Sequence, residues 1–154
     1  MKHFLLAFLL ALICYVFFYS KIENRRTRKG PWEIAFTNDV TGNPTLVINQ
    51  PRLAITNAEV VFTNQHLSAS FKPATVLFNQ PRPVPYELPF GKCVFLDTTF
   101  LPGTVTLELF GHEVELLPRV LVIDRQEHPW LSESTITLHT PAEKPVTAAP
   151  VGSE

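Results

Sequence analysis

An uninterrupted apolar segment at the N-terminus is the strongest constraint that this sequence places on its fold. From Phe4 to Tyr19 the chain has no charged residue, and a run of this kind is stable as a helix removed from water. Such a helix would rise roughly 24 Å, somewhat less than the roughly 30 Å hydrocarbon core of a bilayer. Lys2 and Lys21 flank the run and can extend to the headgroups. We therefore expect residues 1–21 to be a transmembrane anchor, with residues 4–19 in contact with lipid.

A cleaved signal peptide is the alternative for this segment. Cleavage requires small residues at the cleavage position, whereas the segment ends in the bulky sequence YVFFYSK. We therefore favour an uncleaved signal anchor that crosses the membrane once.

Basic residues are concentrated directly after the apolar run. Residues 22–31 contain Arg25, Arg26, Arg28 and Lys29, and we expect them to form a juxtamembrane linker. The positive-inside rule places such a flank in the cytoplasm. We therefore predict a cytoplasmic domain, with the extracytoplasmic side as the alternative.

The rest of the composition favours strands joined by rigid turns. The chain has 14 Pro and 12 Phe but one Met, and aromatic residues favour strands whereas proline favours turns. Thirteen Lys and Arg against fourteen Asp and Glu give a net charge of -1, so no overall field attracts nucleic acid. We expect one β-rich domain at residues 32–140 and no nucleic-acid partner. Residues 141–154 have little to bury and are expected to be disordered.

Two short segments of this domain are nearly repeated. TLVINQPR begins at Thr45 and TVLFNQPR at Thr75, and they follow EIAFTN at Glu33 and EVVFTN at Glu59. Each unit has the pattern strand, turn, strand, so we predict two equivalent hairpins. Proline ends each second strand, because it lacks an N–H and biases the preceding glutamine toward extended geometry. A fainter third unit runs from CVFLD to TVTLELF.

The repeat and the later alternating segments together predict an all-β fold. Phe36 and Phe62 have equivalent positions and should share a core layer. HEVEL and STITLH read as further strands, RVLVID reads as a strand buried on both faces, and RQEHPW reads as a turn. We expect about eight to ten short antiparallel strands in a sandwich-like domain or a partly closed barrel. The proline-rich stretch NQPRPVPYELPFGK should cross between sheets or follow an edge.

The sequence contains no complete catalytic, cofactor or metal signature. The histidines and glutamates that a zinc site could draw on are His66, His112, Glu113, Glu127, His128 and His139. Adjacent residues of a strand point to opposite faces, so the His-Glu neighbours do not form ligand pairs. Cys93 lies in an apolar run, where a buried and inert thiol is the ordinary state. We predict no catalytic residue, no metal and no cofactor.

Three residues remain as candidates for contact with a partner. Arg52 and Arg82 each follow a proline after equivalent strands, and Trp130 lies in the proline turn EHPWLS. Two arginines at one rim could bind carboxylates or phosphates bidentately, and an aromatic residue could anchor a partner. Solvated loop ends and a Trp that plugs the domain are the alternative interpretation.

Our hypothesis is a membrane-anchored binding or assembly module that has a protein partner in a membrane-associated complex. A membrane-tethered hydrolase with unidentified catalytic residues is the alternative. The sequence does not indicate an oligomeric state.

Overall fold

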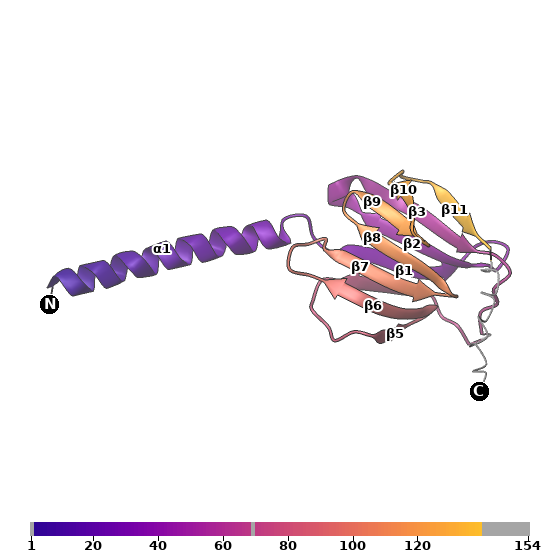
Figure 1. Ribbon diagram of the computed structural model, residues 1–154, viewed down its shortest axis with the longest axis horizontal. Coiled ribbons are helices and arrows are strands. Elements are labelled where there is room, and N and C mark those ends of the chain that lie inside the picture. The colour runs from indigo at the N-terminus through magenta and orange to yellow at the C-terminus, as the bar shows by residue number, and fades with distance from the viewer. Residues whose placement is uncertain (1, 69, 140–154) are drawn as a thin grey trace, which may run out of the picture.

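An N-terminal helix and two β-sheets make up the described part of the chain, residues 2–68 and 70–139 of the computed structural model (Figure 1). The tail predicted at residues 141–154 lies outside these ranges.

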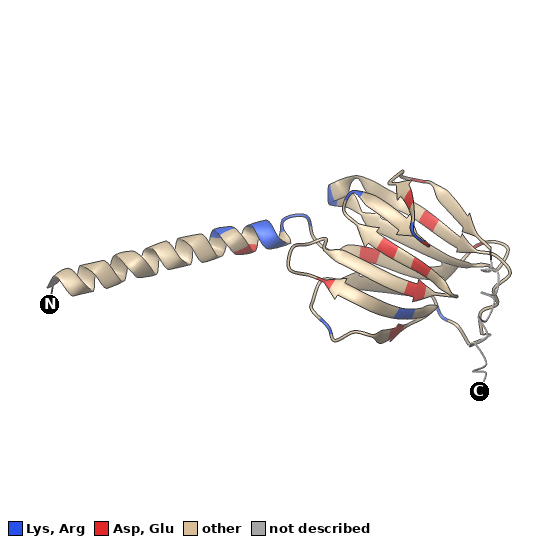
Figure 2. Cartoon of the chain, in the orientation of Figure 1, with Lys and Arg blue, Asp and Glu red and all other residues tan. Residues whose placement is uncertain are grey.

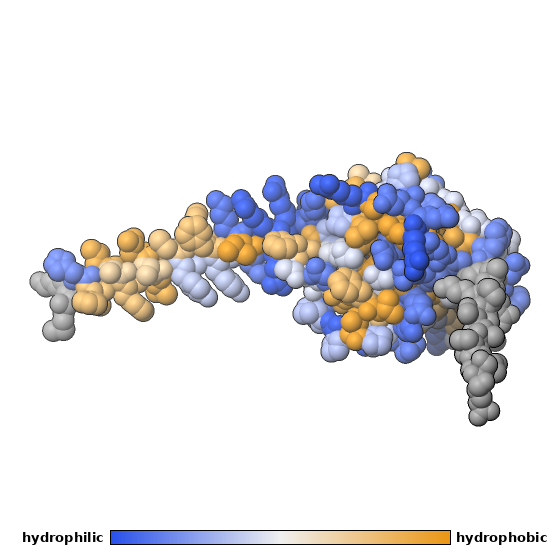
Figure 3. Space-filling model, in the orientation of Figure 1, coloured by the Kyte–Doolittle hydropathy of each residue, from blue (hydrophilic) through white to orange (hydrophobic). Residues whose placement is uncertain are grey.

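Helix α1 (Lys2–Thr27) is long and apolar enough to cross a membrane, and its large apolar side chains are exposed. Figure 3 shows apolar side chains along most of the helix and hydrophilic ones near the domain. The helix continues through the first residues of the segment expected to be a linker. It ends where the Gly30 N–H donates to the Thr27 carbonyl at 3.0 Å, with Gly30 in the left-handed conformation that glycine adopts without strain.

Five strands form the first sheet, in the order β11-β3-β2-β1-β4. Their bounds are β1 (Trp32–Asn38), β2 (Pro44–Gln50), β3 (Ile55–Phe62), β4 (Ala74–Phe78) and β11 (Thr135–Leu138), and a short 3-10 turn, η1 (Pro51–Leu53), follows β2. β11 pairs with β3 in parallel, and the other pairings are antiparallel.

Six strands form the second sheet, in the antiparallel order β10-β9-β8-β7-β6-β5. Their bounds are β5 (Tyr86–Leu88), β6 (Gly91–Asp97), β7 (Thr104–Leu109), β8 (His112–Leu117), β9 (Val120–Ile123) and β10 (Gln126–Pro129).

Both sheets contribute to one hydrophobic core. The Phe90 ring, between β5 and β6, lies 5.2 Å from the Phe36 ring and 6.5 Å from the Phe62 ring, measured between centroids. Phe36 and Phe62 therefore share one core layer. The loop between β3 and β4 adds Leu67 and Phe71 to the same core.

Several expectations about this β-fold need correction. Eleven strands are present in the described residues, more than expected, and one pairing is parallel. Neither sheet closes on itself, so the domain is not a barrel. The expected turn RQEHPW contains the edge strand β10.

The predicted second hairpin is also wrong, and the internal repeat is not a structural repeat. β3 pairs with β2 and β11, whereas β4 pairs with β1. The connector between β3 and β4 is long enough to cross the sheet, because a chain can span about 3.3 Å per residue and strands lie about 4.8 Å apart. The first and third units do pair as expected, as β1 with β2 and β6 with β7.

Candidate functional site

The end of the domain that faces α1 carries the three residues singled out by sequence. β2 and β4 are both antiparallel to β1, so they run in the same direction and end at the same side of the sheet. This places Arg52 and Arg82 at one end of the domain, as the repeat suggested. β1 lies between the two strands, so two strand spacings, about 10 Å, separate their ends.

We refer to this end as the anchor-proximal end. It consists of the segments 27–31, 51–54, 79–85, 98–103, 117–120 and 130–134, which connect the elements on the side of α1 (Figure 1).

Gln50 joins two of these segments and is almost fully buried. Its Nε2 donates to the carbonyl oxygens of Gly30 and Pro31 at 3.0 and 2.7 Å, and its Oε1 accepts from the Arg52 N–H at 3.1 Å. Sequence reasoning assigned Gln50 only to the end of a strand. The amide also fixes the linker against β2 and holds the backbone of Arg52.

Two tryptophans tie further segments together. Trp32 Nε1 donates to the Gly103 carbonyl at 2.9 Å, and Trp130 Nε1 donates to the Leu117 carbonyl at 2.8 Å. The two indole rings contact each other with centroids 5.2 Å apart. Trp130 is therefore partly buried and packs against this end of the core.

Two further hydrogen bonds connect segments at the anchor-proximal end. The Ser132 hydroxyl donates to the Ala54 carbonyl at 2.7 Å, and the Leu101 N–H donates to the Arg26 carbonyl of α1 at 2.7 Å. The loop 98–103 is therefore held against the end of the helix.

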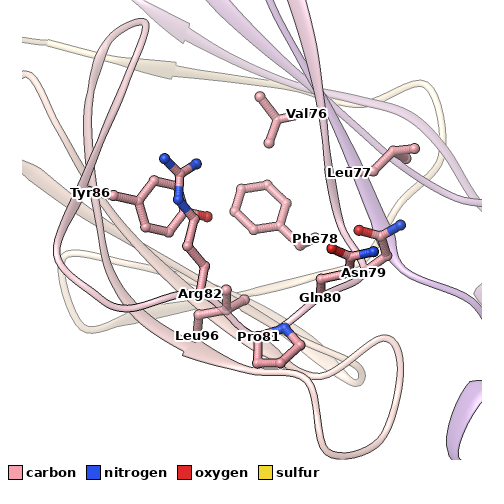
Figure 4. A pocket seen from close by; sticks show the side chains of 9 residues that line it. All are labelled: Val76, Leu77, Phe78, Asn79, Gln80, Pro81, Arg82, Tyr86 and Leu96. Atoms are coloured by element: carbon pink, nitrogen blue, oxygen red, sulfur yellow. The ribbon is translucent and has the colours of Figure 1, made fainter.

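A pocket of about 240 Å³ lies beside β4, on the open side between the two sheets (Figure 4). It is lined by Val76, Leu77, Phe78, Asn79, Gln80, Pro81, Arg82, Tyr86 and Leu96. The Arg82 guanidinium lies over the Tyr86 ring, 4.1 Å from its centroid, a favourable cation–π geometry. Burial raises the pKa of the Tyr86 hydroxyl, so the tyrosine is neutral. The pocket thus combines an apolar wall with one charged group and two exposed amides.

The histidines do not form a metal site within the described residues. His112 is buried, and its Nδ1 lies 2.6 Å from Asp124 Oδ2 while its Nε2 lies 3.0 Å from the His139 carbonyl oxygen. Both ring nitrogens of His112 therefore lie against oxygen atoms that can accept hydrogen bonds. Sequence reasoning missed Asp124. This residue directly follows β9 and contacts His112 at the start of β8.

The His112–Asp124 pair resembles half of a catalytic triad but has a structural arrangement. A general base needs a free ring nitrogen that faces a hydroxyl or thiol, whereas both nitrogens of His112 face acceptors. Cys93 is buried, and burial raises the pKa of its thiol, so the thiol stays protonated. The pair fastens the segment after β11 to the second sheet.

No protein-family model, curated protein or solved structure was found to match this chain.

Proposed function

We propose that this chain is a single-pass membrane protein whose β-domain is a binding module, and that it captures an extended segment of a membrane-associated protein by strand addition at β4. The observation that supports the proposal best is the open, uncharged edge of β4 beside the Arg82 pocket.

The anchor half of the proposal is supported by the length and exposure of α1. A helix of 26 residues rises about 39 Å, at about 1.5 Å per residue, so it crosses a hydrocarbon core of about 30 Å and extends into the headgroups. Its apolar side chains have no protein surface to cover them among the described residues.

The binding half is supported by a comparison of sheet edges. Exposed edge strands are ordinarily blunted by charges or proline, because their free backbone groups attract other strands. β5 contains Glu87 between Pro85 and Pro89, and β10 contains Glu127 and ends at Pro129. β4 itself has no charge and no proline, although Lys72 and Pro73 directly precede it, and its Leu77 is 52% exposed. The remaining edge strand, β11, also lacks charge and proline, so β4 is distinguished from it by the exposed Leu77 and the adjoining Arg82 pocket.

The chemistry of the pocket indicates the kind of segment that β4 would accept. A strand added to β4 gains main-chain hydrogen bonds, and pockets for alternate side chains provide specificity. Leu77 and Val76 offer apolar contacts, and Arg82 offers a charged fork for a carboxylate. We expect an extended segment with an apolar residue near an acidic one. A shared membrane raises the effective concentration of the two partners, so a weak site suffices.

Site-specific photocrosslinking in native membranes tests this proposal. A photoreactive amino acid replaces Leu77 in the full chain, and the matched control carries it at Val40, which is fully exposed in the turn between β1 and β2. We expect one adduct of discrete mass from position 77. Thr75→Lys in the same chain should abolish it, because Lys blunts an edge strand.

Equal adducts from positions 77 and 40, or none from 77, would contradict the proposal. An adduct between two copies of this chain would identify the bound segment as part of a second copy of the chain.

We also propose that the domain lies on the cytoplasmic side, because the basic residues after the apolar run resist translocation. Protease added to intact cells or spheroplasts should leave the domain uncut, and digestion without lysis would place it outside.

A further inference from the structure

We propose that the anchor-proximal end of the β-domain is a second membrane-binding surface, which lies on the headgroups of anionic phospholipids. This inference rests on the proposed membrane anchor, and it adds an orientation and a lipid preference for the domain.

The position of α1 in the bilayer determines the depth at which the anchor-proximal end lies. The segment Phe4–Ile22, in which Lys21 is the one charged residue and can extend to the headgroups, is about 28 Å long as a helix, close to the roughly 30 Å hydrocarbon core. Arg26 then lies about 6 Å further along the axis, within a headgroup layer of about 5 to 8 Å. Since the Leu101 N–H donates to the Arg26 carbonyl, the loop 98–103 lies at the same level as Arg26.

Apolar side chains are exposed at this end. Phe100 and Leu131 are each 59% exposed and Val84 is 39% exposed. Each belongs to a different segment of the anchor-proximal end. The loop of Leu131 is fixed by Ser132, and the loop of Phe100 is fixed by the Trp32 and Arg26 contacts. Exposed apolar residues held in place at headgroup depth suit insertion into the interface.

Basic and acidic residues are distributed unevenly along the axis that runs from α1 through the domain (Figure 2). The basic residues of the last turn of α1 and the anchor-proximal end are Arg25, Arg26, Arg28, Lys29, Arg52, Arg82 and Arg119, against the acidic residues Glu23, Glu33, Asp97 and Glu133. The balance is reversed over the other described parts of the domain, which carry Lys72, Lys92 and Arg125 against Asp39, Glu59, Glu87, Glu108, Glu113, Glu115, Asp124 and Glu127. A domain polarised in this way is attracted to an anionic surface with its basic end inward.

Collision accessibility of spin labels in the full chain tests the inference. Phe100→Cys and Leu131→Cys are labelled separately in a Cys14→Ser background, in which buried Cys93 stays unreactive. Val40→Cys at the opposite end is the control. The proteins are reconstituted into phosphatidylcholine vesicles with and without phosphatidylserine. We expect labels at 100 and 131 to be shielded from a water-soluble relaxant with phosphatidylserine, and the label at 40 to remain accessible.

Neutralising arginines at the anchor-proximal end tests whether this end binds anionic lipid or only lies near the bilayer. Arg52→Gln with Arg119→Gln should shift the docking equilibrium toward the free state by about fivefold per arginine, given the usual attraction of one basic residue to an anionic surface. Lys72→Gln with Arg125→Gln changes the net charge equally at the far end and should leave docking unchanged.

The possible outcomes distinguish failure of the proposed membrane anchor from failure of the docking inference. Release of the protein from vesicles by alkaline carbonate would overturn the anchor and the inference together. Retention of the protein with labels at 100 and 131 as accessible as the label at 40 would overturn the inference alone. Shielding that ignores phosphatidylserine and the arginine pair would also overturn it, because the surface would then be covered by something other than anionic lipid.

Discussion

Gln50 and Gln80 occupy the same place in two copies of the motif NQPR, yet the fold uses them differently. Gln50 is 1% exposed and donates to two carbonyl oxygens of the linker, whereas Gln80 is exposed beside the β4 pocket. The motif predicts where each strand ends, because proline stops the ladder. It does not predict which glutamine is buried, because the linker that covers Gln50 is distant in sequence.

Replacing the buried glutamine should therefore destabilise the domain selectively. Gln50→Ala leaves the Gly30 and Pro31 carbonyls without this donor and should lower the free energy of unfolding by about 1 to 3 kcal/mol. Gln80→Ala is the matched control and should stay within about 0.5 kcal/mol of the wild type. Denaturant titration followed by Trp fluorescence measures both. Equal effects of the two variants would contradict the assignment.

Asp39 gives a pH-dependent prediction in the turn between β1 and β2. Hydrogen bonds from Thr41 and Asn43 to its carboxylate lower its pKa from 3.8 to about 2. A carboxyl whose pKa is lowered by folding contributes stability above its unfolded pKa and loses it as the pH falls through the folded value. The stability difference between wild type and Asp39→Asn should therefore shrink as the pH falls from 3.8 to about 2. NMR titration of the Asp39 carboxyl carbon checks the pKa, and a value near 3.8 would contradict the turn geometry.

At the scale of elements, strand positions were more predictable than strand partners. Alternation locates β8 and β11, whereas a continuous apolar run locates β9, which buries one face more than the other instead of both faces as expected. Pairing depends on which edges remain free. β3 is flanked by β2 and β11, so β4 takes the free edge of β1. β11 follows β3 by more than seventy residues, and no local pattern marks that parallel pairing.

The core layer shared by the two repeat units gives an element-scale test. Phe36→Ala and Phe62→Ala should each cost about 3 to 5 kcal/mol, because both rings are buried against Phe90. The double variant should depart from additivity because the rings share a partner. Phe95→Ala, at a half-exposed position, is the control and should cost far less. A loss under about 1 kcal/mol at both buried sites would contradict the packing.

At the scale of the whole molecule, the uncharged N-terminal run predicted an anchor, and the composition and strand patterns predicted one β-domain after it. The candidate site was less predictable. The arginines could be placed at one end from the repeat, whereas the exposed edge of β4 and the Tyr86 contact of Arg82 depend on how the sheets pack.

Separation of the anchor from the domain gives a whole-molecule prediction. A fragment from Gly30 to His139 retains the core of both sheets and, among the described residues, loses the hydrogen bonds of Gly30 and Leu101 to α1, so we expect it to be folded and soluble. Circular dichroism should show strand. A dominantly helical or insoluble fragment at every ionic strength would contradict the domain boundary.

Strand addition at β4 should be visible in amide hydrogen exchange. Exchange in the peptide that covers residues 74–78 is compared between native membranes and the purified full chain in detergent, with β10 as an internal reference edge. The account predicts slower exchange of β4 in native membranes and no change in β10, because a bound strand satisfies the outward N–H groups of β4 alone. Equal exchange of β4 in both preparations would contradict it.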